Sequence, residues 1–219
     1  MKRKLVDSIV AFSALFLLGS CSKDVLVGDG PIETESRTLA SFASIDIAGN
    51  RTIEIIKSDL YKVEITGYQN LVNAFESNVK DNGLSFGFPN HTRVKNDNIS
   101  IKVFTPNLSA IHFSGNIQAN IGGGFNLQTF EATLSGNGKI YFNEGSVKEL
   151  SIRNSGNGEI YAEKLIAEEA RVEISGNGLA YVHALNTLDI RISGNGEVQY
   201  WGNAKVATSI SGNGKAVPH

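Results

Sequence analysis

The amino-acid sequence predicts an all-β protein: a right-handed parallel β-helix, or solenoid, of about 18–21 residues per coil, with a less regular β N-terminal half. The tetrad S-G-N-G occurs five times at near-constant spacing in the second half. The residues before each tetrad alternate between apolar and polar, as in a strand with one wet face. The chain has 23 Gly but one Met and one Trp, a composition typical of strands and turns.

The first 20 residues have the outline of a signal peptide. Basic residues occupy positions 2–4, an apolar stretch runs from 9 to 18, and two small residues precede Cys21. The apolar stretch is too short to span a membrane, which takes about 20 residues. Cys21 is the only cysteine of the chain, so it has no disulfide partner within it. An ordinary cleaved signal followed by an unpaired thiol is the alternative.

A cysteine directly after small residues resembles the lipobox of bacterial lipoproteins. The resemblance implies that cleavage leaves Cys21 as the mature N-terminus and that this residue carries lipid. Three acyl chains, as in those lipoproteins, exceed the two signals that stable anchoring requires. We therefore expect an exported protein whose membrane partner is reached through the N-terminal lipid. The expected place is the outer membrane or the cell surface, with the periplasmic face as an alternative.

The charge balance bears on the class of partner. Removal of residues 1–20 leaves 17 basic and 21 acidic residues, a net charge of −4. Proteins that bind nucleic acid usually carry clustered Lys and Arg, so nucleic acid is not an expected partner. About 200 mature residues are enough to bury a core as one domain.

The chain divides into segments of different character. Residues 21–40 are small, charged or turn-forming and lack a periodic apolar pattern, which predicts a tether. The predicted organisation is a lipoprotein signal peptide over 1–20, the tether over 21–40, and a solenoid domain over 41–219, irregular over 41–113 and repetitive over 114–217.

The irregular half is strand-like. Apolar and polar residues alternate over 45–47, 63–65 and 99–103. The segment Asp81-Asn82-Gly83 lies between two short apolar runs and predicts a hairpin turn, because Asn and Gly accept a positive φ. The shared apolar face of residues 71–79 predicts a short helix.

The second half is a repeat. The tetrads begin at Ser135, Ser155, Ser175, Ser193 and Ser211, with spacings of 20, 20, 18 and 18. A degenerate copy at 114–116 lies 21 residues before the first, and 48–50 reads as an older copy. Repetition at this period indicates stacked structural units.

The residues beside the tetrads form columns. The residue before each Ser is apolar in four of five copies and the next one back is polar in all, so a strand with a buried face leads into a corner at the glycines. Coils stacked about 4.8 Å apart then align the Asn residues as a hydrogen-bonded structural ladder. Its expected members are Asn137, Asn157, Asn177, Asn195 and Asn213. Arg153, Glu173 and Arg191 share one offset and predict an alternating charge ladder on the outer face.

Other architectures fit the sequence less well. Leucine-rich repeats carry L-x-x-L-x-L, and left-handed β-helices show a hexapeptide period; the sequence has neither pattern. The strand-crossover rule favours the right-handed coil. A β-sandwich built from repeated hairpins stays open as the remaining alternative.

The tetrads, the segment 104–108 (Phe-Thr-Pro-Asn-Leu) and the lipobox together resemble the head GIN domain family of putative adhesins (DUF2807). The resemblance covers roughly Phe42 to the C-terminus, and the repeated S-G-N-G is its most specific part. It implies an all-β, β-helix-like fold behind a lipoprotein signal. The family name suggests adhesion, and the family supplies no catalytic residues to carry over.

Catalytic and metal chemistry find little support in the sequence. A glycan-cleaving β-helix needs clustered carboxylates, and Asp189 is the only Asp after Ser114. Glu168 and Glu169 are neighbours on a strand and should point to opposite faces. The tetrad offers no charge to calcium, and the four histidines are not at metal-ligand spacing. We expect no catalytic residue, no metal site and no cofactor.

Three tyrosines recur at the same offset from the tetrads. Tyr141, Tyr161 and Tyr181 each follow the Asn of a tetrad by four residues. Their neighbours are the apolar members of the alternation, so the tyrosines should point outward and form a flat strip that binds sugar faces or a partner surface. Cross-rung stacking without a ligand is the alternative. The strip is expected to end or bulge at Gln199.

These features predict a lipid-anchored, non-catalytic protein of the cell envelope that acts in adhesion or in binding a glycan or protein surface. A polysaccharide-active β-helix enzyme and a purely structural spacer are the alternatives.

Overall fold

The computed structural model describes residues 25–219, and the predicted signal peptide and Cys21 lie outside this range. Strands make up 72% of these described residues and helix 3%, which confirms the all-β class. In chain order the elements are β1 (Val25–Val27), β2 (Ile32–Thr38), β3 (Ser44–Lys57), β4 (Lys62–Tyr68), α1 (Gln69–Ala74), β5 (Glu76–Lys80), β6 (Gly83–Gly87), β7 (Arg93–Lys95), β8 (Ser100–Thr105), β9 (Ala110–Ile121), β10 (Phe125–Gly136), β11 (Lys139–Phe142), β12 (Gly145–Gly156), β13 (Glu159–Gly176), β14 (Leu179–Gly194), β15 (Glu197–Trp201), β16 (Lys205–Gly212) and β17 (Lys215–Pro218). Within this part of the chain, no helix is both long and apolar enough to cross a membrane.

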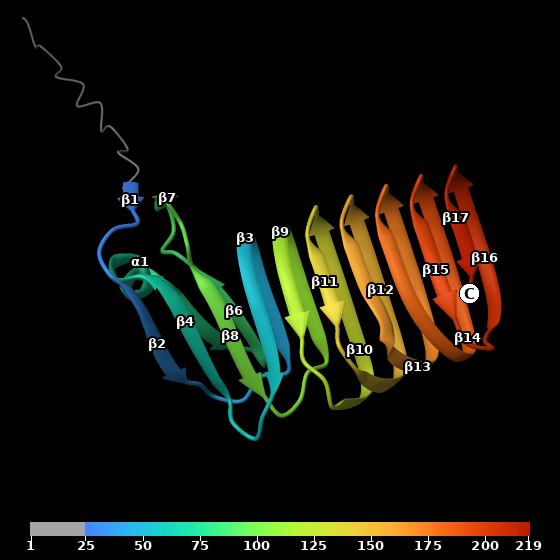
Figure 1. The fold of residues 1–219 in the computed structure, drawn as a ribbon, viewed down its shortest axis with the longest axis horizontal. Helices are drawn as coiled ribbons and strands as arrows, with labels where there is room; N and C mark the ends of the chain where they lie inside the picture. The colour runs from blue at the N-terminus through green and yellow to red at the C-terminus, as the bar shows by residue number, and fades with distance from the viewer. Residues whose placement is uncertain (1–24) are drawn as a thin grey trace, which may run out of the picture.

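From residue 110 onward the chain winds as a parallel β-solenoid of about five turns (Figure 1). One series of parallel pairs joins β9, β10, β12, β13, β14 and β16, and a second joins β9, β11, β13, β14, β15 and β17. Ser135 pairs with Ser155, and Ser155 with Ser175, so the tetrads stack in register. These parallel pairs confirm the solenoid and exclude a sandwich of hairpins for the repeats.

The tetrad corners carry the predicted ladder of asparagine side chains. Asn177 Nδ2 donates to Asn157 Oδ1 at 2.9 Å, and Asn195 Nδ2 donates to Asn177 Oδ1 at 2.9 Å. The ladder comprises Asn50, Asn116, Asn137, Asn157, Asn177, Asn195 and Asn213. Its side chains are exposed, so water can replace a lost partner and each bond contributes about 1 kcal/mol or less.

Both glycines of the tetrad are required by close approach between coils. Gly176 has a φ of +126°, and a Cβ on it would lie 2.6 Å from the carbonyl oxygen of Gly156 in the preceding coil. A Cβ on Gly196, a second tetrad glycine, would lie 2.5 Å from Ile174 Cγ2. The first glycine therefore lets the backbones stack at the corner, and the second makes room for the aliphatic residue of the preceding coil.

The inward-facing residues form one continuous core along the solenoid. The column before the tetrads contains Leu134, Ile174 and Ile192, each at most 2% exposed, and its last member Ile210 is 42% exposed in the final coil. Asn154 interrupts this column and is 1% exposed. Its Nδ2 donates to Gly158 O at 2.7 Å, whereas its Oδ1 accepts no hydrogen bond from the described residues.

The N-terminal half contains an earlier coil. β3 pairs in parallel with β9 over twelve residues, and Gly49 and Asn50 lie opposite Gly115 and Asn116, which confirms the older copy at 48–50. β8, β4 and β2 continue the sheet from β3, with β4 antiparallel to both of its neighbours.

The predicted hairpin is present between β5 and β6. Asp81 and Asn82 have φ values of 49° and 65°, the left-handed conformation that a tight hairpin turn requires. The predicted helix is shorter than expected, because α1 ends at Ala74 and residues 76–80 pair with β6 as strand β5.

The tether predicted over 21–40 is wrong for its described part. β2 pairs with β4 over seven residues as an edge strand, and β1 pairs with β7. Arg37 on β2 donates to Phe75 O at 2.6 Å and to Val72 O at 3.0 Å, which fastens the strand to the end of α1. The strand is held by backbone pairing and polar contacts, so it lacks the buried apolar period that identifies a strand in the sequence.

Candidate functional site

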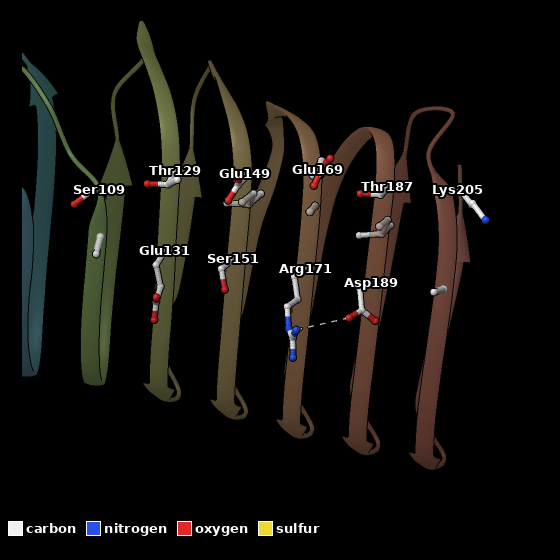
Figure 2. A pocket seen from close by; sticks show the side chains of 15 residues that line it. Ser109, Thr129, Glu131, Glu149, Ser151, Glu169, Arg171, Thr187, Asp189 and Lys205 are labelled. Atoms are coloured by element: carbon white, nitrogen blue, oxygen red, sulfur yellow. Dashed lines mark ion pairs between the residues drawn. The ribbon is translucent and has the colours of Figure 1, made fainter.

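The outer side of the repeats is hollowed into a groove of about 780 Å³ (Figure 2). Two columns of side chains line it and run along the solenoid from coil to coil. The first comprises Thr129, Glu149, Glu169, Thr187 and Lys205, and the second comprises Ala110, Glu131, Ser151, Arg171, Asp189 and Ala207. At about 4.8 Å per coil, the six-member column spans roughly 24 Å. The site is therefore long and open, and its lining combines polar side chains with apolar surface.

The predicted charge ladder borders this groove. Glu173 Oε1 lies 2.5 Å from Arg171 Nη2 and 3.9 Å from Arg191 Nη1, and Glu173 Oε2 lies 3.4 Å from Arg153 Nε. Asp189 is a second hub, because Arg171 and Arg191 lie 4.0 and 3.1 Å from its carboxylate. These side chains contact one another across coils, so the ion pairs constrain their orientations on the outer surface.

This network favours the ionised form of Glu173. The hydrogen bond from Arg171 is the main reason that the pKa of the Glu173 carboxyl lies below its ordinary value of 4.5. A carboxyl whose pKa is lower in the folded than in the unfolded chain stabilises the fold above the unfolded pKa. That contribution is lost as pH falls through the folded pKa.

We expect Glu173→Arg to lower the melting temperature at low salt by about 2–4 °C, because it replaces three attractive contacts with repulsion at a solvent-exposed site. The deficit should shrink as salt is added, since exposed charges are screened. Thermal unfolding at two salt concentrations measures both effects, with Glu168→Arg as a charge-matched control outside the network. An unchanged melting temperature at low salt would show that these side chains do not interact.

A pair of carboxylates in the groove was missed by sequence reasoning. Glu149 and Glu169 are register partners on adjacent coils, and both side chains are exposed. Neither forms an ion pair with another residue of the 25–219 range. Their common offset, six residues before Ser155 and Ser175, was the signal that could have identified the pair.

The tyrosine column lies on another side of the coil, on β11, β13 and β14. The ring centroids of Tyr141 and Tyr161 are 4.7 Å apart and those of Tyr161 and Tyr181 are 4.6 Å apart, with planes within 9° of parallel. Rings stacked in this way cover one another's faces and present edges and hydroxyl groups to solvent. The expectation of a flat platform is therefore wrong in its geometry.

The aromatic column also continues past the point where it was expected to end. Gln199 takes the register position opposite Tyr181, but the Trp201 ring lies 6.4 Å from the Tyr181 ring, and the His219 ring stacks on Trp201 at 4.5 Å. Residues two apart on a strand share a face, so Trp201 can replace the missing ring.

Polar contacts fix Tyr161, the central ring of the column. The Tyr161 hydroxyl donates to Glu159, which also pairs with Lys139 Nζ at 2.9 Å. The hydrogen bond to Glu159 strongly raises the pKa of Tyr161, so this hydroxyl stays protonated. The column accordingly has the contacts of a stabilising stack.

Groups that could bind a metal ion or carry other chemistry are few among the described residues. The stretch from 25 to 219 contains no cluster of three or more His, Cys, Asp or Glu side chains that could hold a metal ion. His112 Nδ1 lies 3.0 Å from Asp46 Oδ1 on the exposed surface. The predicted lipidation residue, Cys21, lies outside the described residues.

Comparison with known proteins gives a family and several structural relatives. Residues 41–204 match the family described as "Putative auto-transporter adhesin, head GIN domain". No protein in a search of curated sequences matches the chain.

The structural relatives have the same fold at low sequence identity. A putative adhesin from Bacteroides fragilis NCTC 9343 has a TM-score of 0.70 and 20% identity, and the match covers 89% of this chain and 100% of that one. A putative adhesin from Parabacteroides distasonis ATCC 8503 has a TM-score of 0.53 and 24% identity, with 90% and 100% covered. A protein from the same organism, described as a putative lipid binding protein, has a TM-score of 0.55 and 21% identity, with 90% and 100% covered.

Proposed function

The chain belongs to the head GIN domain family of putative auto-transporter adhesins, and from this premise we propose that it is a lipid-anchored, non-catalytic binding protein of the cell envelope. Membership of an adhesin family favours an exported or surface protein. Acylation of Cys21 would hold the protein at a membrane. The ligand we propose is a neutral glycan chain, bound along the groove of the solenoid.

The groove carries this proposal. It crosses six stacked strands and offers hydroxyl, carboxylate and guanidinium groups at the spacing of the coils, which suits a ligand that is itself extended and repetitive. Ser151, Thr129 and Thr187 can donate and accept hydrogen bonds with sugar hydroxyls. Leu150, Ala170 and Leu188 add apolar surface to the lining.

The charge of the groove selects among glycans. Its lining has four carboxylates, Glu131, Glu149, Glu169 and Asp189, against two basic groups, Arg171 and Lys205. A net negative lining repels polyanions such as acidic polysaccharides. A neutral glycan avoids this repulsion and can still accept hydrogen bonds from Arg171 and donate to the carboxylates.

We expect Ser151→Tyr to abolish capture of glycans, because the new ring fills the middle of the groove without changing its charge. The measurement is a glycan array probed with residues 22–219, which lack the predicted lipidation residue Cys21. Asn120→Tyr is the matched control, since it adds the same ring at the register position next to Tyr141 on the aromatic side. Equal capture by the two variants would contradict the assignment of the groove.

The same array separates the alternatives. Release of shorter products would favour a polysaccharide-active enzyme, for which Glu149 and Glu169 are the candidate carboxylate pair. Their exposure to water argues against it, because the general acid of such enzymes works in a sheltered site. Absence of capture from all glycans would favour a structural spacer.

The column of Tyr141, Tyr161 and Tyr181 is a second candidate binding surface, through ring edges and hydroxyl groups. Replacement of all three by Ser should lower stability, because each cross-strand aromatic contact contributes up to about 1 kcal/mol. Loss of glycan capture in a variant that stays folded would move the binding site to this column.

A further inference from the structure

The short ribbon of β1 and β7 has an outer face of unusual composition. The strands are parallel, with Val25 opposite Arg93 and Val27 opposite Lys95. Register partners project to the same side of a sheet, so two valines and two basic residues share one face. All four side chains are exposed, Val25 at 49% and Val27 at 50%. A face made only of apolar and basic side chains suits a surface that has both apolar and anionic groups.

The opposite face of the ribbon is fastened to the domain. Leu26 and Val94 pack against the hydrophobic core. Gly28 N donates to Lys95 O at 2.9 Å, and Asn70 Nδ2 donates to Val27 O at 2.7 Å. A Cβ on Gly28 would collide with Asn96 O, so the chain packs too closely at this position for any side chain. The ribbon and the domain therefore move as one body.

The position of the ribbon relative to the lipid follows from chain length. Cys21 precedes Val25 by four residues. Four residues reach at most about 14 Å, even fully extended. The ribbon lies at the N-terminal end of the molecule, and the solenoid extends away from it (Figure 1). An acylated Cys21 thus brings this face to the membrane surface, because no long tether separates the two.

We propose that the outer face of the β1–β7 ribbon, formed by Val25, Val27, Arg93 and Lys95, docks onto an anionic lipid bilayer. The proposal rests on the lipid anchor of the proposed function. The valines enter the boundary between headgroups and acyl chains, and the two cations contact lipid phosphates. Docking orients the solenoid, so the anchor fixes the direction in which the glycan groove points.

The test uses the lipidated mature protein in vesicles of equal parts phosphatidylcholine and phosphatidylglycerol. Cys21 is the only cysteine, and acylation consumes its thiol, so a single introduced cysteine can be spin-labelled. The labelled variants are Val27→Cys and, as a control far along the solenoid, Leu185→Cys, whose parent side chain is 45% exposed. Relaxation by oxygen reports contact with lipid, and relaxation by a water-soluble nickel complex reports contact with water.

We expect the label at 27 to become several-fold less accessible to nickel and more accessible to oxygen on vesicles, with no change at 185. Arg93→Glu together with Lys95→Glu should reverse the shift, and so should pure phosphatidylcholine. If the protein floats with the vesicles but the label at 27 is as accessible to nickel as the label at 185, docking is overturned and the anchor is retained. Absence of flotation overturns both docking and the anchor. Protection of position 27 without vesicles, in a dimer, assigns the face to a second copy of the chain and overturns the proposal.

Discussion

Replacing Gly176 with alanine is expected to destabilise the protein by about 3 kcal/mol. Two costs add. The φ of +126° is a conformation that residues with a Cβ rarely adopt, and the new Cβ would lie 2.6 Å from Gly156 O. The oxygen belongs to the backbone of the neighbouring coil, so it cannot move without breaking the stack. Urea unfolding followed by circular dichroism measures the change.

Two other glycines separate these costs. Gly49 has a φ of +99°, but an added Cβ would meet nothing within 4 Å, so Gly49→Ala should show the conformational cost alone, about 1 kcal/mol. Gly87 has neither a positive φ nor a close neighbour, so Gly87→Ala should be near neutral. If Gly176→Ala were no worse than Gly49→Ala, close stacking of the tetrads would not be the reason for its glycine.

Replacing Cys21 with serine is expected to move the protein from the membrane fraction to the soluble fraction. Serine cannot form the thioether to lipid, and the docking face proposed for the β1–β7 ribbon is too small to hold the protein without the acyl chains. Membrane fractionation and incorporation of labelled fatty acid measure the change. Ser20→Ala is the control, because it keeps a small residue before the cleavage site.

The two variants should differ completely. Ser20→Ala should remain acylated and sediment with membranes, whereas Cys21→Ser should do neither. A Cys21→Ser protein that keeps its labelled fatty acid would mean that the lipid is attached elsewhere or that the anchor is of another kind.

The repeats were predictable because every coil has the same steric requirements at its corner. Every tetrad needs a backbone turn at its first glycine and space at its second, so the motif recurs with little variation. The same logic identified residues 48–50 as an earlier coil across a 66-residue separation between Asn50 and Asn116. The edge strand β2 was not predictable, because its contacts are backbone hydrogen bonds and polar side chains, which leave no apolar period.

The charge ladder that borders the candidate site was predictable, but the groove itself was not. Offsets from the tetrad placed Arg153, Glu173 and Arg191 side by side, and the ion pairs are present. The groove depends on how the side of the coil is hollowed, which no offset reveals. The stacking of Tyr141 on Tyr161 depends on ring orientation, and the sequence gives only the position of the Cβ atoms.

If the groove holds an extended neutral glycan without cleaving it, the affinity for oligosaccharides must depend on their length, which calorimetry with a series of increasing length measures. We expect the affinity to rise with each added sugar until the ligand fills about 24 Å, the length of the groove, and then to level off. The oligosaccharides should be recovered intact. Affinity that does not depend on length, absence of binding at every length, or recovery of shortened products would overturn the assignment of the groove as a non-catalytic glycan site.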